Sequence, residues 1–293
     1  MKLGLYPPLS APIATPEYLT ALAQAAERLG FNSIWAPEHV VLFAEHEGSR
    51  YPYSADGQIG VPPNAGILDP FEVLTFIAAV TKTIRVGTGI ALVAQRNPVY
   101  TAKAAASLDW LSNGRFDFGI GLGWLKQEFD AVQVPWARRA QRTAEYVEVM
   151  KRLWTDQETS FEGEFYSLDK VWQYPKPVQQ PHPPLYFGGE SDAALKRAAK
   201  LGDGWFGYFH DVLSARERLS RLEELLAEQG RSRNDVRIMI TPKGHRVSPE
   251  IIEQFAELGV DELVFAAGAR HIEDAIGRLE TMAEQLLPVA ARV

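Results

Sequence analysis

Two residues suited to proton transfer, Glu38 and His39, stand directly after a short apolar run, Ser33 to Ala36. Imidazole exchanges protons near neutral pH and often acts as a general acid or base. If the run is a barrel strand, the pair lies at its carboxyl end, where barrel enzymes place catalytic residues. We therefore predict that His39 handles a proton, positioned with help from Glu38. On spacing alone, a histidine that only packs is the alternative.

Glycines follow other apolar runs, where a bare backbone can approach a flat ligand. One set is Gly87-Thr88-Gly89-Ile90, with Arg96-Asn97-Pro98 shortly after it. A second is Gly119-Ile120-Gly121-Leu122-Gly123-Trp124, whose third glycine comes one position too early for the dinucleotide pattern GxGxxG. A third, Gly188-Gly189, precedes a predicted helix and exposes backbone N–H groups that suit a phosphate. Tight turns and helix caps are the structural alternatives for all three.

The composition of the chain excludes several kinds of site and argues against several kinds of partner. The chain has 293 residues, no cysteine and a net charge of −7. Disulfides, thiolate metal sites and a cysteine nucleophile are excluded, and no histidine spacing indicates a metal site. The negative charge argues against nucleic acid and anionic membranes as partners. No apolar run is long enough for a signal peptide or a membrane span, so we expect a cytoplasmic protein.

Apolar runs alternate with amphipathic segments along the chain, which predicts parallel strands joined by helices. End signals mark the helices, such as Thr15 and Pro16 at the start of the first helix and Gly30 at its end. Eight such units favour a closed barrel over an open sheet. We predict an α/β fold, a single (β/α)8 TIM barrel over residues 1–293, with insertions at the C-terminal rim. The predicted strands are 3–6, 33–36, 84–88, 116–120, 185–187, 204–207, 236–240 and 262–265.

Two segments are longer than ordinary barrel loops. Residues 40–69 are rich in glycine, proline and aromatic side chains, and residues 155–184 contain a hairpin-like stretch and several prolines. Long loops in compact domains are often lids or binding walls, so we expect both at the C-terminal rim, and 40–69 to close over the substrate. Aromatic residues expected there indicate a partly apolar substrate: Tyr6, Trp35, Tyr51, Tyr53, Trp124 and Trp172.

Taken together, these pieces resemble the bacterial luciferase-like monooxygenase superfamily over essentially the whole chain. No single piece is specific, but their order matches the family. The matching pieces are Leu29 to Trp35, Glu38-His39, Val86 to Gly89, Arg96 to Pro98, Leu111 to Arg115, Gly119 to Leu125, Glu128-Phe129, Arg142 to Trp154, Pro183 to Gly189, and Gly202 to Trp205.

The resemblance implies a homodimer, a flavin-type ring in the barrel mouth and a non-proline cis peptide at Gly89-Ile90. Glu38 and His39 would face the reacting ring carbon, and the glycine pair would take the cofactor phosphate. The remaining expected cofactor contacts are Thr88, Gly89, Ile90, Asn97, Gly121 and Gly123, and the expected substrate pocket comprises Tyr6, Tyr51, Tyr53 and Trp124.

The stretch Gly123 to Phe129 resembles a branch that depends on the 8-hydroxy-5-deazaflavin coenzyme F420. Sugar-6-phosphate dehydrogenases of this superfamily carry Glu where this chain has Trp124, which argues against that substrate. We therefore expect an F420-dependent oxidoreductase acting on a small organic molecule. One alternative is an FMN-dependent monooxygenase supplied by a separate reductase. The other is a non-catalytic barrel that binds a ligand, although such relatives would be expected to lose the rim glycines.

Overall fold

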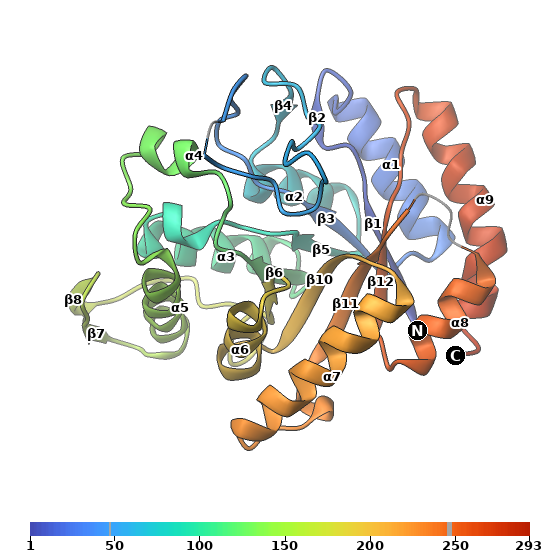
Figure 1. The fold of residues 1–293 in the computed structure, drawn as a ribbon. Coiled ribbons are helices and arrows are strands. Elements are labelled where there is room, and N and C mark those ends of the chain that lie inside the picture. Colours follow the sequence, from blue (N-terminus) through green and yellow to red (C-terminus); the bar gives the residue numbers. More distant parts are fainter. Residues whose placement is uncertain (47, 245–247) are drawn as a thin grey trace.

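The structure, a computed structural model, describes residues 1–46, 48–244 and 248–293. Within these residues, eight parallel strands close into a barrel in the order β1-β12-β11-β10-β9-β6-β5-β3 (Figure 1). This confirms the predicted α/β TIM-barrel fold. The barrel strands are β1 (Lys2–Tyr6), β3 (Ser33–Ala36), β5 (Arg85–Thr88), β6 (Phe116–Ile120), β9 (Leu185–Gly188), β10 (Gly204–His210), β11 (Arg237–Pro242) and β12 (Glu262–Ala266).

Helices surround the barrel, and local signals set several of their ends. Helix α1 begins after Thr15, whose side chain accepts a hydrogen bond from the Tyr18 N–H, and it ends at Gly30 in the left-handed conformation. These ends agree with the predicted ones. The other helices are α2 (Pro70–Val80), α3 (Pro98–Leu111), α4 (Lys126–Ala131), α5 (Arg139–Thr155), α6 (Asp192–Leu201), α7 (Val212–Glu228), α8 (Pro249–Glu257) and α9 (Ile272–Ala290), with short 3-10 turns at Val93–Gln95 and Arg233–Asp235.

Large side chains fill the barrel interior. Trp35 is completely buried and packs against Phe206, with ring centroids 4.9 Å apart, and against Tyr186 at 6.1 Å. The expectation that Trp35 belongs to the aromatic rim is therefore wrong. Its strand turns the indole inward, because alternate residues of a barrel strand face the interior.

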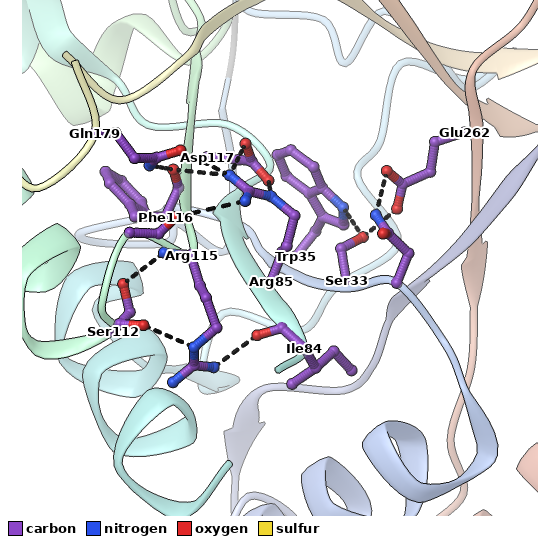
Figure 2. A network of polar contacts seen from close by, with 12 residues as sticks. Ser33, Trp35, Ile84, Arg85, Ser112, Arg115, Phe116, Asp117, Gln179 and Glu262 are labelled. Carbon is purple, nitrogen blue, oxygen red and sulfur yellow. Dashed lines mark hydrogen bonds and ion pairs between the residues drawn. The ribbon is translucent and has the colours of Figure 1, made fainter. Parts of the chain in front are cut away.

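The N-terminal end of the barrel is occupied by polar side chains (Figure 2). Arg85 donates to both carboxylate oxygens of Asp117, at 2.6 and 2.7 Å, while Glu262 accepts hydrogen bonds from Ser33 and Asn32. A cavity of about 630 Å³ lies beside these groups. It is at the opposite end from the strand C-termini. Arg85 and Asp117 pair with each other, and Glu262 has hydrogen-bond donors, so we assign this cavity a structural role.

The segment 155–184 does not lead into the C-terminal rim, so that prediction was wrong. It forms a hairpin of β7 (Thr159–Glu162) and β8 (Ser167–Val171) outside the barrel, beside α5 (Figure 1). The segment then enters β9 from its N-terminal end, where the Pro184 carbonyl accepts from the Phe118 N–H. Trp172 lies on this outer segment and donates to Glu158, away from the rim. All barrel strands are parallel, so the chain enters each strand at its N-terminal end. The connection from α5 to β9 therefore ends at the edge of the barrel opposite the mouth.

The segment 40–69 leaves the C-terminal end of β3 and contains β4 (Gly66–Ile67), which pairs antiparallel with β2 (Ser10–Ala11). This small sheet, which the sequence did not predict, joins the segment to the loop after β1. The segment therefore lies at the mouth, as expected. None of the described helices is long and apolar enough to cross a bilayer.

Candidate active site at the barrel mouth

The mouth is formed by residues at the carboxyl ends of the strands. Tyr6 ends β1, Thr241 lies near the end of β11, and His39 and Trp124 follow β3 and β6. His39 is in contact with Trp124, with ring centroids 6.1 Å apart in an edge-on arrangement. Two separate strand ends thus bring a titratable ring and an indole together.

The carboxylate beside His39 belongs to Glu128 on α4. The His39 Nδ1 atom lies 3.4 Å from Glu128 Oε2, too loosely placed for a well-formed hydrogen bond. Among the described residues, no partner is recorded for His39 Nε2, so this nitrogen is the one open to a ligand. Glu128 is fully buried and accepts a hydrogen bond from the Val40 N–H at 2.7 Å. It therefore fixes the chain around His39 as well as facing its ring.

Glu38 does not position His39 through a side-chain contact, which corrects the prediction. Its buried carboxylate pairs with Arg96, and it also accepts a hydrogen bond from the Leu92 N–H. Burial raises the pKa of Glu38, and the Arg96 guanidinium opposes that rise. Side chains of adjacent residues in an extended chain point in opposite directions, so the Glu38 carboxylate does not contact the His39 ring. Glu128 belongs to the pair Glu128-Phe129 that matches the family, but the sequence does not show that its carboxylate lies beside His39.

Aromatic side chains of the segment 40–69 reach across the mouth. The Tyr51 ring lies 5.3 Å from Trp124 and 5.4 Å from Tyr53, and the Tyr53 ring lies 4.7 Å from Tyr208 on β10. Three of the four predicted substrate-pocket residues therefore form one cluster with Tyr208. The sequence did not single out Tyr208, or His46, which lies 5.2 Å from Trp124.

The fourth predicted pocket residue, Tyr6, lies deeper and donates its hydroxyl hydrogen to the Gly89 carbonyl. Burial, reinforced by the neighbouring phenols, raises the pKa of Tyr6, and burial likewise raises that of Tyr51 and Tyr53. All three phenols therefore stay neutral at working pH and are poor bases. The hydroxyl hydrogens of Tyr6 and Tyr53 are already donated, to the Gly89 carbonyl and to the Glu190 carboxylate.

The peptide between Gly89 and Ile90 is cis, as the resemblance implied. The predicted cofactor residues around it are held by the barrel itself. Thr88 donates its hydroxyl hydrogen to the Gly119 carbonyl at 2.7 Å, and Gly123 has φ +76° beside the Phe129 ring.

Gly121 makes room for the side chain of Ile90. A Cβ atom at this position would lie 1.9 Å from Cδ1 of Ile90. The glycine is thus explained by packing against Ile90, and whether the backbone here also contacts a cofactor stays a prediction.

Two further predicted cofactor positions have different surroundings. Asn97 caps α3, since its side-chain oxygen accepts from the Val99 and Tyr100 N–H groups, and its amide nitrogen donates to the Tyr166 hydroxyl at 3.2 Å. Gly188 ends β9, and Gly189 follows with φ +106°, a conformation that favours glycine. The turn then passes through Ser191, which caps α6. Gly188 and Gly189 are therefore close to a helix start, as predicted.

Polar atoms without partners gather at the mouth. Nε1 of Trp124 and Oγ1 of Thr241 are buried and have no hydrogen-bond partner among the described residues. Buried polar groups are normally satisfied, so such atoms mark places where a ligand completes the bonding. Together with the aromatic faces of Trp124 and Tyr51, they suit a flat heterocycle with a polar edge, such as a flavin or deazaflavin.

The chain also matches a known protein family. Residues 4–245 match the family described as luciferase-like monooxygenase. The chain belongs to this family. An uncharacterized protein of Mycobacterium tuberculosis is 34% identical over 267 residues, which cover 91% of this chain and 93% of the relative.

Two other similar proteins have names that state a cofactor. An FMNH(2)-dependent dimethylsulfone monooxygenase of Pseudomonas putida is 31% identical over 218 residues, covering 73% of this chain and 54% of the relative. The solved structure of an F420-dependent secondary alcohol dehydrogenase with an F420-acetone adduct has a TM-score of 0.78 at 20% identity, covering 99% of this chain and 98% of that chain. The latter likeness shows the shared luciferase-like fold. Luciferase-like proteins thus include both F420-dependent dehydrogenases and FMN-dependent monooxygenases.

Proposed function

We propose that this luciferase-like protein transfers a hydride between bound coenzyme F420 and a small, partly apolar organic substrate. The observation that carries the proposal is the placement of His39 at the mouth. Its Nδ1 atom faces the buried Glu128, while Nε2 has no partner among the described residues. A ring held in this way can exchange a proton with a ligand.

A bound deazaflavin would supply the hydride carrier, because its chemistry is a two-electron transfer. His39 would give or take, at Nε2, the proton that accompanies the hydride. Glu128 would hold the ring on its Nδ1 side. The neutral phenols of Tyr51 and Tyr53 would line the substrate pocket, and the Trp124 indole would form an apolar wall.

The same aromatic cluster would keep water out during transfer. Tyr53 hydrogen-bonds to Glu190 in the turn after β9, in addition to its ring contact with Tyr208. The segment 40–69 is thereby fastened to the opposite side of the mouth from β3. Release of these contacts would admit the substrate, and their return would close the site.

We also propose that the turn at Gly188 and Gly189 takes the cofactor phosphate. The Ser191 side chain caps only the Ala194 N–H, so the first N–H groups of α6 have no intrahelical acceptor. Such a helix start attracts an anion. The neighbouring Glu190 carboxylate is turned away and occupied, because it accepts from the Tyr208 N–H at 2.9 Å and pairs with His210.

A second function, an FMN-dependent two-component monooxygenase, is favoured by the 31% identity to the FMNH(2)-dependent dimethylsulfone monooxygenase. In that case a separate reductase would supply reduced flavin. The same mouth would then have to exclude water from an oxygenated flavin, for which the cover by Tyr51 and Tyr53 is equally suited.

Cofactor titration separates the two functions. The purified protein is titrated with F420 and with FMN, in oxidised and reduced form, and followed by fluorescence. The proposal expects binding of F420 and oxidation of reduced F420 by small ketones or aldehydes without oxygen uptake. Binding of FMN alone, with an oxygenated product formed from an organic substrate when reduced FMN is supplied, would establish the second function. A protein that binds neither cofactor would contradict both.

We further propose that the protein is a homodimer, as the resemblance implies. Large apolar side chains stand exposed on α3 and on the neighbouring segment before β9, and a second copy would cover them. Their exposed fractions are 80% for Tyr100, 58% for Trp110, 63% for Leu111 and 57% for Trp172. Sedimentation of the wild type and of Trp110→Lys tests this proposal. A wild type that is monomeric at micromolar concentration would refute it.

A further inference from the structure

The carboxylate of Glu190, in the turn after β9, contacts two parts of the molecule that are far apart in the sequence. It accepts a hydrogen bond from the Tyr208 N–H at 2.9 Å and pairs with Nε2 of His210, both near the end of β10. The phenol of Tyr53, in the segment 40–69, donates to the same carboxylate. An ionised carboxylate only accepts, so all three partners act as donors. One side chain therefore connects the segment over the mouth to the turn and to β10.

Strand β10 departs from regular geometry beside this carboxylate. Its pairing with β11 shifts register between Tyr208 and His210, and the intervening Phe209 has φ +65° with its side chain 41% exposed. The left-handed region is unfavourable for residues other than glycine, and such strain is kept mainly at functional sites. Irregularities of this kind next to an active site redirect side chains. Here the irregularity brings a backbone N–H and an imidazole to one carboxylate.

Strand β10 also holds the backbone of the turn. The Trp205 indole N–H donates to the Gly189 carbonyl at 3.0 Å, and the Trp205 and His210 ring centroids lie 5.4 Å apart. On its other side, Nδ1 of His210 lies 3.2 Å from Oγ of Ser214, in the first turn of α7. The imidazole is thus contacted at both nitrogens, and its side chain is only 6% exposed. Because one strand holds both the turn and its carboxylate, the position of the turn affects the position of Tyr53.

The two ends of the segment 40–69 are held by a single arginine. Arg96 pairs with Glu38, two residues before the segment, and with Asp69, its last residue. Charge-assisted pairs of this kind are among the stronger polar contacts in proteins. With both ends held, an opening movement is expected in the middle of the segment, where Tyr53 lies. The hydrogen bond from Tyr53 to Glu190 is therefore placed to control that movement.

We propose that Glu190 and His210 form a latch that positions Tyr53 over the barrel mouth. Opening of the segment 40–69 breaks the hydrogen bond from Tyr53 and leaves the turn after β9 with one contact fewer. A ligand that orders this turn therefore favours closure, and closure favours binding of that ligand, because coupling between two sites is reciprocal. The latch itself depends only on contacts within the chain, whereas its coupling to a ligand rests on the proposed function.

Trypsin measures opening of the segment without any ligand. Arg50 is the only lysine or arginine within residues 40–69, and it is exposed and directly precedes Tyr51. Cleavage requires the chain on both sides of the bond to leave the mouth, so its rate follows the population of the open segment. Tyr53→Phe removes the hydroxyl and keeps the ring. It should raise the rate of cleavage at Arg50 about 5-fold or more, with the Tm and cleavage at other sites nearly unchanged.

The two latch residues are tested by disruptive and conservative changes. Glu190→Ala removes the acceptor and should raise cleavage at Arg50 at least as much as Tyr53→Phe, and combining the two changes should add little. His210→Gln keeps an N–H donor and should stay close to the wild type, whereas His210→Ala should open the segment. The matched control is Glu217→Ala, which removes a carboxylate from an exposed position on α7 and should leave the rate unchanged.

The cofactor arm repeats the digestion with saturating F420 and with saturating FMN. The cofactor that binds should slow cleavage of the wild type about 10-fold or more, since a ligand that favours closure lowers the population of the open segment. Tyr53→Phe should lose most of this protection. In the fluorescence titration, the same variant should bind that cofactor more weakly than the wild type does.

The outcomes separate the latch from the proposed function. Equal cleavage at Arg50 in the wild type and in Tyr53→Phe would overturn the latch. Faster cleavage at all basic sites together with a lowered Tm would indicate a purely structural role and would also overturn it. Equal protection of both proteins by a bound cofactor would overturn the coupling. Cleavage that depends on Tyr53 and Glu190, in a protein that binds neither cofactor, would support the latch while removing the proposed function.

Discussion

Replacing Gly121 with alanine tests how the barrel mouth is packed. The new Cβ atom would lie 1.9 Å from Cδ1 and 2.8 Å from Cγ1 of Ile90. Ordinary contact begins near 3.4 Å, so the Cδ1 methyl group has to retreat by about 1.5 Å. Ile90 packs against the buried cluster that contains Trp35 and Phe206, so it cannot move inward. It must swing toward the mouth.

Overpacking of this kind typically costs about 1–3 kcal/mol in the free energy of unfolding. Isoleucine is stiff at χ1 because it is β-branched, which places the cost toward the upper end of that range. Urea unfolding measures the change through the midpoint at constant m-value. The displaced side chain should also weaken cofactor binding in the fluorescence titration.

The double variant Gly121→Ala/Ile90→Ala removes the side-chain atoms of Ile90 with which the new Cβ atom would clash. Ile90→Ala alone should cost about 1–3 kcal/mol, because the side chain is only partly buried. In the double variant the atoms that clash are absent, so its cost should be smaller than the sum of the two single costs by about 1 kcal/mol or more. Costs that add to within about 0.5 kcal/mol would refute the argument that Gly121 exists to accommodate Ile90.

The remaining predictions concern catalysis, binding and pH. His39→Asn should lower turnover about 100-fold or more with cofactor affinity nearly kept, and a near-normal rate with an unchanged pH profile would leave His39 as a wall of the pocket. Gly189→Val should weaken cofactor binding strongly with the fold retained, because valine is strained at φ +106°. Circular dichroism checks that the fold is kept and titration measures the cofactor affinity, and an unchanged affinity would refute the prediction. Deleting residues 51–63 should impair substrate binding more than cofactor binding, whereas equal losses would mark the segment as structural. Burial opposes ionisation of Glu27, but the N–H groups of Thr83, Ile84 and Lys82 lower its pKa to about 2. The folded-state pKa is below the unfolded one, so this stabilisation is present above about pH 4.5 and is lost as the pH falls toward 2. After discounting for solvent screening, Glu27→Gln should cost about 1–2 kcal/mol near pH 7 and little near pH 2, and a cost independent of pH would contradict the assignment.

Much of the fold was readable from the sequence, because local signals determine it. The start of α1 at Pro16 follows from the cap at Thr15, and its end follows from Gly30. Short apolar runs located all eight barrel strands to within a few residues. The cis peptide at Gly89-Ile90 came from the family resemblance, since no local rule predicts it. The segment 155–184 was expected at the C-terminal rim from its length and hairpin-like sequence. That prediction was wrong because the segment leads into a parallel strand, β9, which it must enter at the N-terminal end of the barrel.

Less of the candidate site than of the fold could be predicted from the sequence, because its contacts depend on tertiary structure. His39 was found from its place after a strand, and Tyr51, Tyr53 and Trp124 from their aromatic character at loops near the mouth. The carboxylate beside His39 was assigned to its neighbour in sequence, whereas the structure brings Glu128 from α4. Contacts within one turn or cap are encoded by adjacent residues and can be read directly. A contact between side chains from different strand ends depends on how the barrel closes and on which way each side chain turns, and only the folded structure decides that.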